Sequence, residues 1–206
     1  MRIEEVNQSI LVSGESGAGK TETTKIMMAH LASVAGGTDD ETIRKVLECN
    51  PLLESFGNAK TVRNDNSSRF GKFTILQFGE TGRLIGASCK TYLLERSRIV
   101  HQTEEERNYH IFHQVLAAPV EEKERYHLVG GAGDFRFVPN STCTVIEGCS
   151  DADAFVKTKT ALGLIGIDDD VQGQMFTLMG VVLNLGQVRP WTCAAVVIWQ
   201  WEEGRL

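Results

Sequence analysis

The sequence lacks several features that define special classes of protein. Its five cysteines are an odd number with no C-x-x-C pair, which argues against a small disulfide-stapled fold and favours reduced thiols. The longest apolar run, 193–198, is far shorter than the roughly 20 residues that cross a bilayer. The first residues are too acidic for a signal peptide. A net charge of −6 argues against a broad nucleic-acid surface. These absences predict a soluble, cytoplasmic chain with no membrane span and no nucleic-acid partner.

What the sequence does contain is a glycine-rich octapeptide near its start. An apolar run over 8–13 predicts a buried strand before it, and residues 22–34 predict a helix after it. Strand, glycine loop and helix together are typical of a P-loop, in which backbone N–H groups converge on a phosphate at the helix N-terminus. The alternative is a glycine-rich turn that matches by chance. The predicted phosphate-binding residues are Gly14, Glu15, Ser16, Gly17, Ala18, Gly19, Lys20 and Thr21.

Two residues of this loop have chemistry beyond that of the backbone. The Lys20 ammonium places a full positive charge near the outer phosphates of a nucleotide. The Thr21 hydroxyl is a hard oxygen ligand of the kind that Mg²⁺ accepts. The loop therefore predicts binding of a nucleotide phosphate together with Mg²⁺.

The rest of the chain predicts a mixed α/β fold. An antiparallel hairpin is expected over 69–92, because two β-rich runs flank the turn 79–82. Segment 93–100 is either a further strand or a buried connection. A helix after the capping residues 38–40 is expected to stop or kink at Pro51, with a new turn over 52–56. Further helices are predicted over 104–118, 150–164 and 168–185.

Two clusters raise the question of a metal site. His110 and His113 lie three residues apart on a predicted helix, but no other ligand has matching spacing nearby. The acidic run 168–170 stands at a predicted helix start, where the helix dipole already favours negative charge. We therefore interpret both clusters as structural.

The polar segment 64–72 is the candidate for a second half of the site. Its hydroxyls, carboxamides and guanidinium can complete a Mg²⁺ shell, hold an attacking water and pair with a carboxylate. By itself the segment is equally compatible with an Asx-rich turn.

Several motifs, in this order along the chain, resemble the myosin motor head, and most closely the unconventional, cargo-transporting members. They are the loop 14–23, Asn50-Pro51, 56–61, 64–72, 92–98 and 106–112. The likeness runs from about residue 8 to about residue 188. The resemblance implies an actin-activated ATPase that couples ATP hydrolysis to movement on actin filaments, with ATP and Mg²⁺ as cofactors, in a myosin complex of the actin cytoskeleton.

The resemblance also implies residue roles. Lys20 contacts the outer phosphates, Asn64 contacts phosphate, and Ser67 helps to hold the attacking water. Thr21 and Ser68 are then the Mg²⁺ ligands, and Arg69 pairs with a carboxylate of the segment called switch II. The implied fold is a P-loop NTPase core with a transducer β-hairpin and a helical upper subdomain.

The resemblance is incomplete. No switch II motif, base-side loop or actin-binding region is recognised, so the chain resembles a piece of a larger protein. We expect 1–188 to be a partial motor domain and 189–206 to be a tail unlike the family. This polypeptide alone is expected to bind Mg·ATP weakly, with negligible turnover and no actin binding. The alternatives are a small-molecule or nucleoside kinase and a non-catalytic truncated product.

Overall fold

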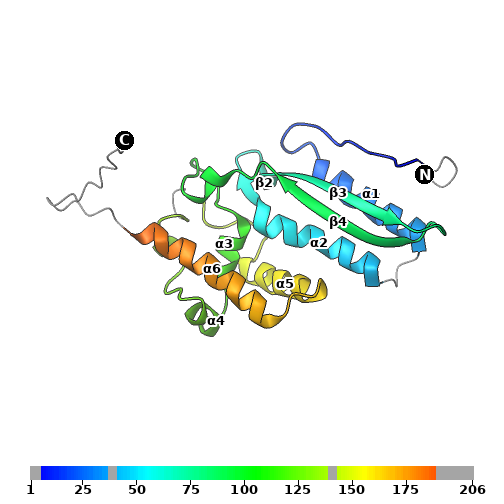
Figure 1. Cartoon of the computed structure of the whole chain (residues 1–206). Helices are drawn as coiled ribbons and strands as arrows, with labels where there is room; N and C mark the ends of the chain where they lie inside the picture. The colour runs from blue at the N-terminus through cyan, green and yellow to red at the C-terminus, as the bar shows by residue number, and fades with distance from the viewer. Residues whose placement is uncertain (1–5, 37–40, 139–142, 189–206) are drawn as a thin grey trace, which may run out of the picture.

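The computed structural model describes residues 6–36, 41–138 and 143–188 (Figure 1). The described chain is a mixed α/β structure. The expected tail 189–206 lies outside the described residues. In chain order the elements are α1 (Lys20–Gly36), α2 (Glu41–Gly57), β1 (Asn58–Thr61), β2 (Asn64–Ser68), β3 (Gly71–Phe78), β4 (Leu84–Tyr92), η1 (Arg96–Ile99), α3 (His110–Leu116), α4 (Val120–Arg125), η2 (Ala132–Asp134), α5 (Asp151–Leu164) and α6 (Asp169–Gln187).

The elements gather into two regions, which we call the loop half and the helical half. The loop half contains the N-terminal chain 6–19 with most of the glycine loop, helix α1, the N-terminal part of α2 and the long β3–β4 hairpin. Helices α1 and α2 lie along the hairpin (Figure 1). The helical half contains α3 to α6, packed against the C-terminal part of α2. The short antiparallel pair β1–β2 lies between them, directly after α2. Among the described residues, no helix is both long and apolar enough to cross a membrane.

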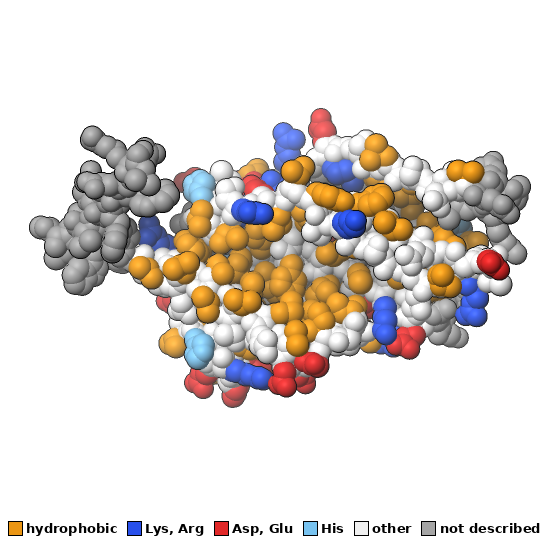
Figure 2. Space-filling model, viewed as in Figure 1, with side chains coloured by type: hydrophobic (Ala, Val, Ile, Leu, Met, Phe, Trp, Pro, Cys, Tyr) orange, Lys and Arg blue, Asp and Glu red, His pale blue; other side chains and the backbone are white. Residues whose placement is uncertain are grey.

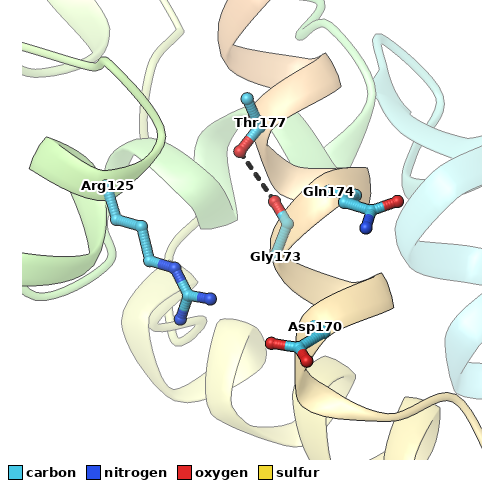
Figure 3. A pocket seen from close by; sticks show the side chains of 5 residues that line it. All are labelled: Arg125, Asp170, Gly173, Gln174 and Thr177. Atoms are coloured by element: carbon cyan, nitrogen blue, oxygen red, sulfur yellow. Dashed lines mark hydrogen bonds between the residues drawn. The ribbon is translucent and has the colours of Figure 1, made fainter.

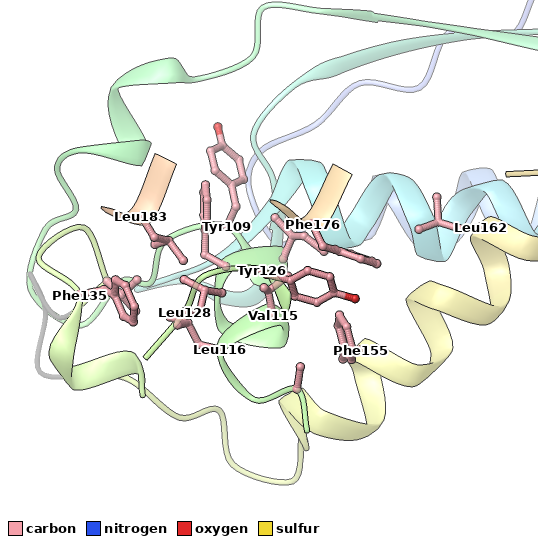
Figure 4. Packing of buried hydrophobic residues seen from close by; sticks show 14 residues of the cluster. Tyr109, Val115, Leu116, Tyr126, Leu128, Phe135, Phe155, Leu162, Phe176 and Leu183 are labelled. Carbon is pink, nitrogen blue, oxygen red and sulfur yellow. The ribbon is translucent and has the colours of Figure 1, made fainter. Parts of the chain in front are cut away.

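The helical half is built on one large apolar core. Phe176 of α6 is fully buried, with ring centroids 5.4 Å from Tyr126 and 5.1 Å from Phe155 (Figure 4). Gly180 lets α6 approach this core closely, because a Cβ there would lie only 2.1 Å from the Tyr126 carbonyl oxygen. The buried members are Tyr109, Ile111, Phe112, Val115, Leu116, Ala118, Tyr126, Leu128, Phe135, Val138, Phe155, Leu162, Phe176 and Leu183.

A buried polar triad joins three helices beside this core. The Ser55 hydroxyl lies 2.8 Å from the Thr158 hydroxyl, although 103 residues separate them in sequence. Thr158 also contacts the Gln114 Oε1 at 2.8 Å, and the Gln114 side-chain amide donates to Ser55 at 3.2 Å. Every member has a partner, so the triad compensates the desolvation that burial imposes on polar groups.

The stop expected at Pro51 and the new turn expected over 52–56 are wrong, because α2 runs through Pro51 to Gly57. A proline has no N–H to donate to the carbonyl four residues earlier, here that of Leu47. The Asn50 side-chain amide lies 3.4 Å from this carbonyl oxygen and replaces the missing donor. Its other side-chain atom, Oδ1, accepts from the Lys72 ammonium of β3 at 3.0 Å, which ties α2 to the hairpin.

The predicted hairpin and the predicted helix starts near 150 and 168 are confirmed, whereas the capping residues expected over 38–40 lie outside the described residues. Strands β3 and β4 form the expected antiparallel hairpin, with Thr74 opposite Cys89. The Ser150 hydroxyl accepts from the Asp153 N–H at the start of α5. The Asp168 carboxylate accepts from the Val171 N–H at the start of α6. Such local signals depend little on the rest of the fold.

Two sequence expectations fail. The strand expected over 8–13 is irregular chain, with Leu11 92% exposed, because no described strand pairs with it. The helix expected from 104 begins only at His110, since the Arg107 N–H donates to the Lys60 carbonyl at 3.0 Å instead of entering a helix. Helix α4 was not expected at all. Of the two alternatives for segment 93–100, the structure has the connection, which contains η1 with Arg98 buried.

Candidate functional site

The glycine loop keeps a distinctive backbone even though the described residues before it, 6–13, form no strand. Gly17 and Gly19 both have φ of +83°, a region that residues with a Cβ rarely adopt. The helix then begins at Lys20, so its first N–H groups have no carbonyl partner within the helix. The Lys20 ammonium donates to the carbonyls of Gly14 at 2.5 Å and Glu15 at 2.7 Å. The loop therefore places the N-terminal N–H groups of a helix beside a lysine whose ammonium donates to backbone oxygens.

The loop lies against the second candidate segment. The Ser16 hydroxyl is 3.3 Å from the Ser67 hydroxyl, across 51 residues of sequence. A Cβ at Gly17 would lie 3.8 Å from the Arg63 carbonyl oxygen, in the turn between β1 and β2. The two segments singled out in the sequence are thus brought together in space.

Strand β2 presents its two serines on opposite faces. Ser67 is buried and also contacts the Thr61 hydroxyl at 2.9 Å, whereas Ser68 is exposed and donates to the Phe70 carbonyl at 3.0 Å. The Asn64 side chain accepts from the Asn66 N–H at 2.8 Å, which is the Asx-turn geometry that the sequence alternative proposed. The segment is therefore a strand that begins with an Asx turn. Strand β2 contains only polar residues, so no hydrophobic pattern in the sequence indicated a strand here.

Arg69 has a carboxylate partner within the described chain. Its Nε lies 2.6 Å from the Glu95 carboxylate, which also lies 2.7 Å from Arg98. Arg98 reaches Glu106 at 2.8 Å. Burial alone would raise the pKa of Glu95, but its hydrogen bonds to Arg69 and Arg98 outweigh this and lower it. Sequence reasoning assigned no role to Glu95, although it stands in one of the motifs that carried the resemblance.

The two histidines belong to the packing of α3. The His110 Nε2 lies 3.2 Å from the Asn66 Oδ1, and burial together with nearby Arg107 lowers the pKa of His110 to about 4. His113 is buried, and the same causes lower its pKa well below the usual value. In the described ranges no three His, Cys, Asp or Glu side chains are positioned to share a metal. The Asp168 carboxylate serves as the cap of α6.

A surface groove between α4 and α6 is separate from these segments. It has a volume of about 480 Å³ and is lined by Arg125, Asp170, Gly173, Gln174 and Thr177 (Figure 3). The Arg125 guanidinium lies over Gly173, where a Cβ would approach it to 3.1 Å. Because the groove contains no residue of the glycine loop or of β2, it does not contribute to the candidate site.

The site thus joins a glycine loop at a helix N-terminus to a hydroxyl-bearing strand, an arrangement typical of proteins that bind phosphate groups. The family model of the myosin head (motor domain) matches residues 1–192. The chain belongs to the myosin head family, as its motifs indicated.

Individual relatives agree with this assignment. The chain is 48% identical over 188 residues to Myosin-7 of Arabidopsis thaliana, covering 90% of this chain and 11% of the relative. It is 50% identical over 185 residues to Myosin-11 of the same plant, covering 88% of this chain and 12% of the relative. It is 51% identical over 185 residues to Protein OPAQUE1 of Zea mays, with the same coverage. The chain therefore spans only a small part of the length of these relatives.

Proposed function

We propose that this chain is the ATP-binding part of an actin-based motor that couples ATP hydrolysis to movement on actin filaments. The observation that carries the proposal is the 3.3 Å contact between Ser16 and Ser67, which joins the glycine loop to the serine strand. Membership of the myosin head family supports the same function and argues against the kinase alternative. The proposed fold is correspondingly a P-loop core with a transducer hairpin, β3–β4, and a helical upper subdomain.

The residues of the loop fit a nucleotide phosphate. The N–H groups at the start of α1 point toward the loop and can donate to an anion. The positive φ values of Gly17 and Gly19 let the loop backbone approach that anion closely. Lys20 is bound only to loop carbonyls, so its ammonium can transfer to the outer phosphates at little cost. In this proposal residues 14–21 bind the phosphates, and the Asn64 side chain adds a polar contact.

The chemistry of two hydroxyls fits a Mg²⁺ ion that keeps part of its water shell, although Ser68 lies on the face of β2 opposite to Ser67 and would have to give up its bond to the Phe70 carbonyl. Thr21 lies in the first turn of α1 and Ser68 is exposed on β2, and both offer the neutral oxygen ligands that Mg²⁺ uses beside phosphate. When bound, the ion neutralises charge on the phosphate oxygens. We assign Thr21 and Ser68 as its protein ligands and Ser67 as the residue that orients the attacking water.

For the 206-residue polypeptide by itself we propose weak Mg·ATP binding and negligible turnover. Arg69 is held by Glu95, so its guanidinium is engaged within the chain. Positioning is the largest part of phosphoryl-transfer catalysis, and small displacements of such groups reduce rates strongly. Single-turnover hydrolysis at the rate of a whole motor would contradict this statement.

Titration with a fluorescent ATP analogue and Mg²⁺ tests the binding proposal. Wild type should bind saturably, whereas Lys20→Ala should weaken binding by roughly 10- to 100-fold through loss of a charged phosphate contact. The matched control is Lys45→Ala, because Lys45 is an exposed lysine on α2 that pairs only with Glu41. Equal affinities of wild type and Lys20→Ala would overturn the assignment of the loop.

Co-sedimentation with actin filaments separates the motor from a non-catalytic product. Because the recognised motifs contain no actin-binding segment, the chain should remain in the supernatant with or without nucleotide. Pelleting with actin at micromolar affinity would place an actin contact within residues 1–206 and would require this part of the proposal to be revised.

A further inference from the structure

Glu54 belongs to neither the glycine loop nor the serine strand β2, but it contacts β2 and the helix that follows the loop. It lies in the last turn of α2, and its side chain is only 19% exposed. One carboxylate oxygen is 2.7 Å from the Lys25 ammonium of α1, the helix that follows the glycine loop. The other accepts a hydrogen bond of 3.2 Å from the Asn66 side-chain amide of β2. A single carboxylate therefore bridges α1 and β2.

The Asn66 side chain is held on both of its polar atoms. Its Nδ2 donates to Glu54, and its Oδ1 accepts from the Asn58 side chain at 2.9 Å and contacts His110 at 3.2 Å. Successive side chains of a strand point to opposite faces, so a fixed Asn66 directs Ser67 toward the other face. That face is where Ser67 meets Ser16 of the loop.

The Lys25 end of the bridge is also well defined. Its ammonium lies 2.9 Å from Glu22 as well as 2.7 Å from Glu54. Burial alone would lower the pKa of Lys25, but the hydrogen bonds to Glu54 and Glu22 outweigh this and raise it. The lysine therefore stays charged, and the contact with the largely buried carboxylate is a charge-assisted one.

We propose that Glu54 is a positioning residue that couples the glycine-loop helix to the serine strand and thereby sets the geometry between the two halves of the nucleotide site. It contacts no residue assigned to phosphate or Mg²⁺, so it acts through Lys25 and Asn66. Only the expected effect of Glu54 on nucleotide binding rests on the proposed function. The bridge itself is a property of the chain without ligand.

Hydrogen exchange on the full chain without nucleotide tests the bridge. Glu54→Gln keeps the size of the side chain but removes the charge and one acceptor. Exchange at the amides of 64–68 should rise about tenfold, the factor that corresponds to loss of one charge-assisted hydrogen bond. The matched control is Glu48→Gln on the same helix, which should leave these amides within about twofold of wild type. Unchanged exchange in Glu54→Gln would overturn the proposal.

A second variant keeps the test independent of whether Glu54→Gln folds. Lys25→Met removes the α1 end of the bridge, and Lys25 itself does not contact β2 among the described contacts. If the Glu54 carboxylate couples the position of α1 to that of β2, Lys25→Met should also raise exchange at 64–68 several-fold. If exchange rises only around residue 25, Glu54 does not couple the two elements.

The consequence for the site is tested by adding Mg²⁺ with a non-hydrolysable ATP analogue. In wild type the analogue should protect 14–21 and 64–68 together, whereas in Glu54→Gln protection should extend over 14–21 only. Joint protection in both proteins would overturn the coupling. Absence of protection in wild type would count against the proposed nucleotide binding, while the experiments without ligand would still decide whether the bridge exists.

Discussion

The loop half and the helical half bury their apolar side chains to different degrees. The helical half has a core of fourteen buried apolar residues, with Phe176 and Leu183 fully enclosed. The loop half has a cluster of six, and it leaves Leu11 92% and Phe73 52% exposed. Figure 2 shows apolar side chains spread over the middle of the visible face. The half that carries the proposed chemistry is the one with less core of its own.

The two halves are also stabilised by different kinds of contact. Burial of apolar area is the main favourable term in folding, so the helical half supplies most of the stability of the described chain. The loop half depends more on individual polar contacts, such as Lys72 to Asn50 and Glu54 to Lys25. We therefore expect the loop half to open at lower free energy than the helical half.

The largest effect is expected from removing the centre of the helical core. Phe176→Ala should reduce the free energy of unfolding by about 3–5 kcal/mol, through lost burial and the cavity left behind. Urea unfolding followed by circular dichroism measures this change. The control is Leu178→Ala on the same helix, which is 60% exposed and should cost below about 1 kcal/mol. Similar losses for both variants would show that this core does not dominate stability.

A smaller loss of stability is expected from adding a methyl group beside the core of the helical half. Gly180→Ala places a methyl group against the Tyr126 carbonyl oxygen and should destabilise the chain by about 1–3 kcal/mol, despite the better helix propensity of alanine. At Gly163 of α5 a Cβ would meet its nearest atom, of Gln172, only at 3.9 Å. Gly163→Ala should therefore stabilise by up to about 1 kcal/mol. Thermal melts of the two variants should move in opposite directions, and a shared direction would contradict the packing described.

Acid should weaken the packing around α3. His110 has a pKa of about 4 in the folded chain and an ordinary value near 6.5 when unfolded. Between these values the unfolded chain binds the proton and the folded chain does not, so stability falls as pH drops from 6.5 toward 4. His110→Gln should flatten this dependence by about 1–2 kcal/mol in urea unfolding at pH 7 and pH 5. His101→Gln, which changes an exposed histidine, serves as control, and an unaltered slope in His110→Gln would refute the assignment.

The smallest effect on stability is expected in the loop half itself. Lys20 contacts only exposed carbonyl oxygens, so Lys20→Ala should change the free energy of unfolding by less than about 0.5 kcal/mol while it weakens nucleotide binding. Parallel measurement of the melting temperature and of analogue binding checks both. A large loss of stability would mean that the loop supports the fold as well as the ligand.

Much of this structure could be predicted from local sequence signals. The hairpin turn over 79–82 and the caps Ser150 and Asp168 act within a few residues, so they appear in the structure as expected. The motifs also identified the family. For the site, the sequence singled out the loop and the segment 64–72, which the fold brings into contact through Ser16 and Ser67.

What could not be predicted depends on partners far away in the chain. The course of α2 through Pro51 depends on the Asn50 side chain, and the late start of α3 depends on the contact of Arg107 with Lys60. The run 8–13 has strand composition, but no described strand pairs with it. The partner of Arg69 was likewise missed, because no local pattern links it to Glu95, 26 residues later.

The buried triad of Ser55, Gln114 and Thr158 cannot form until the last of its three helices has been synthesised. During synthesis Ser55 leaves the ribosome 103 residues before Thr158, a delay of about 5–20 s at typical elongation rates. Until the end of that interval the Ser55 hydroxyl lacks Thr158, and in its first part it also lacks Gln114. The final packing of the C-terminal part of α2 therefore waits for α5.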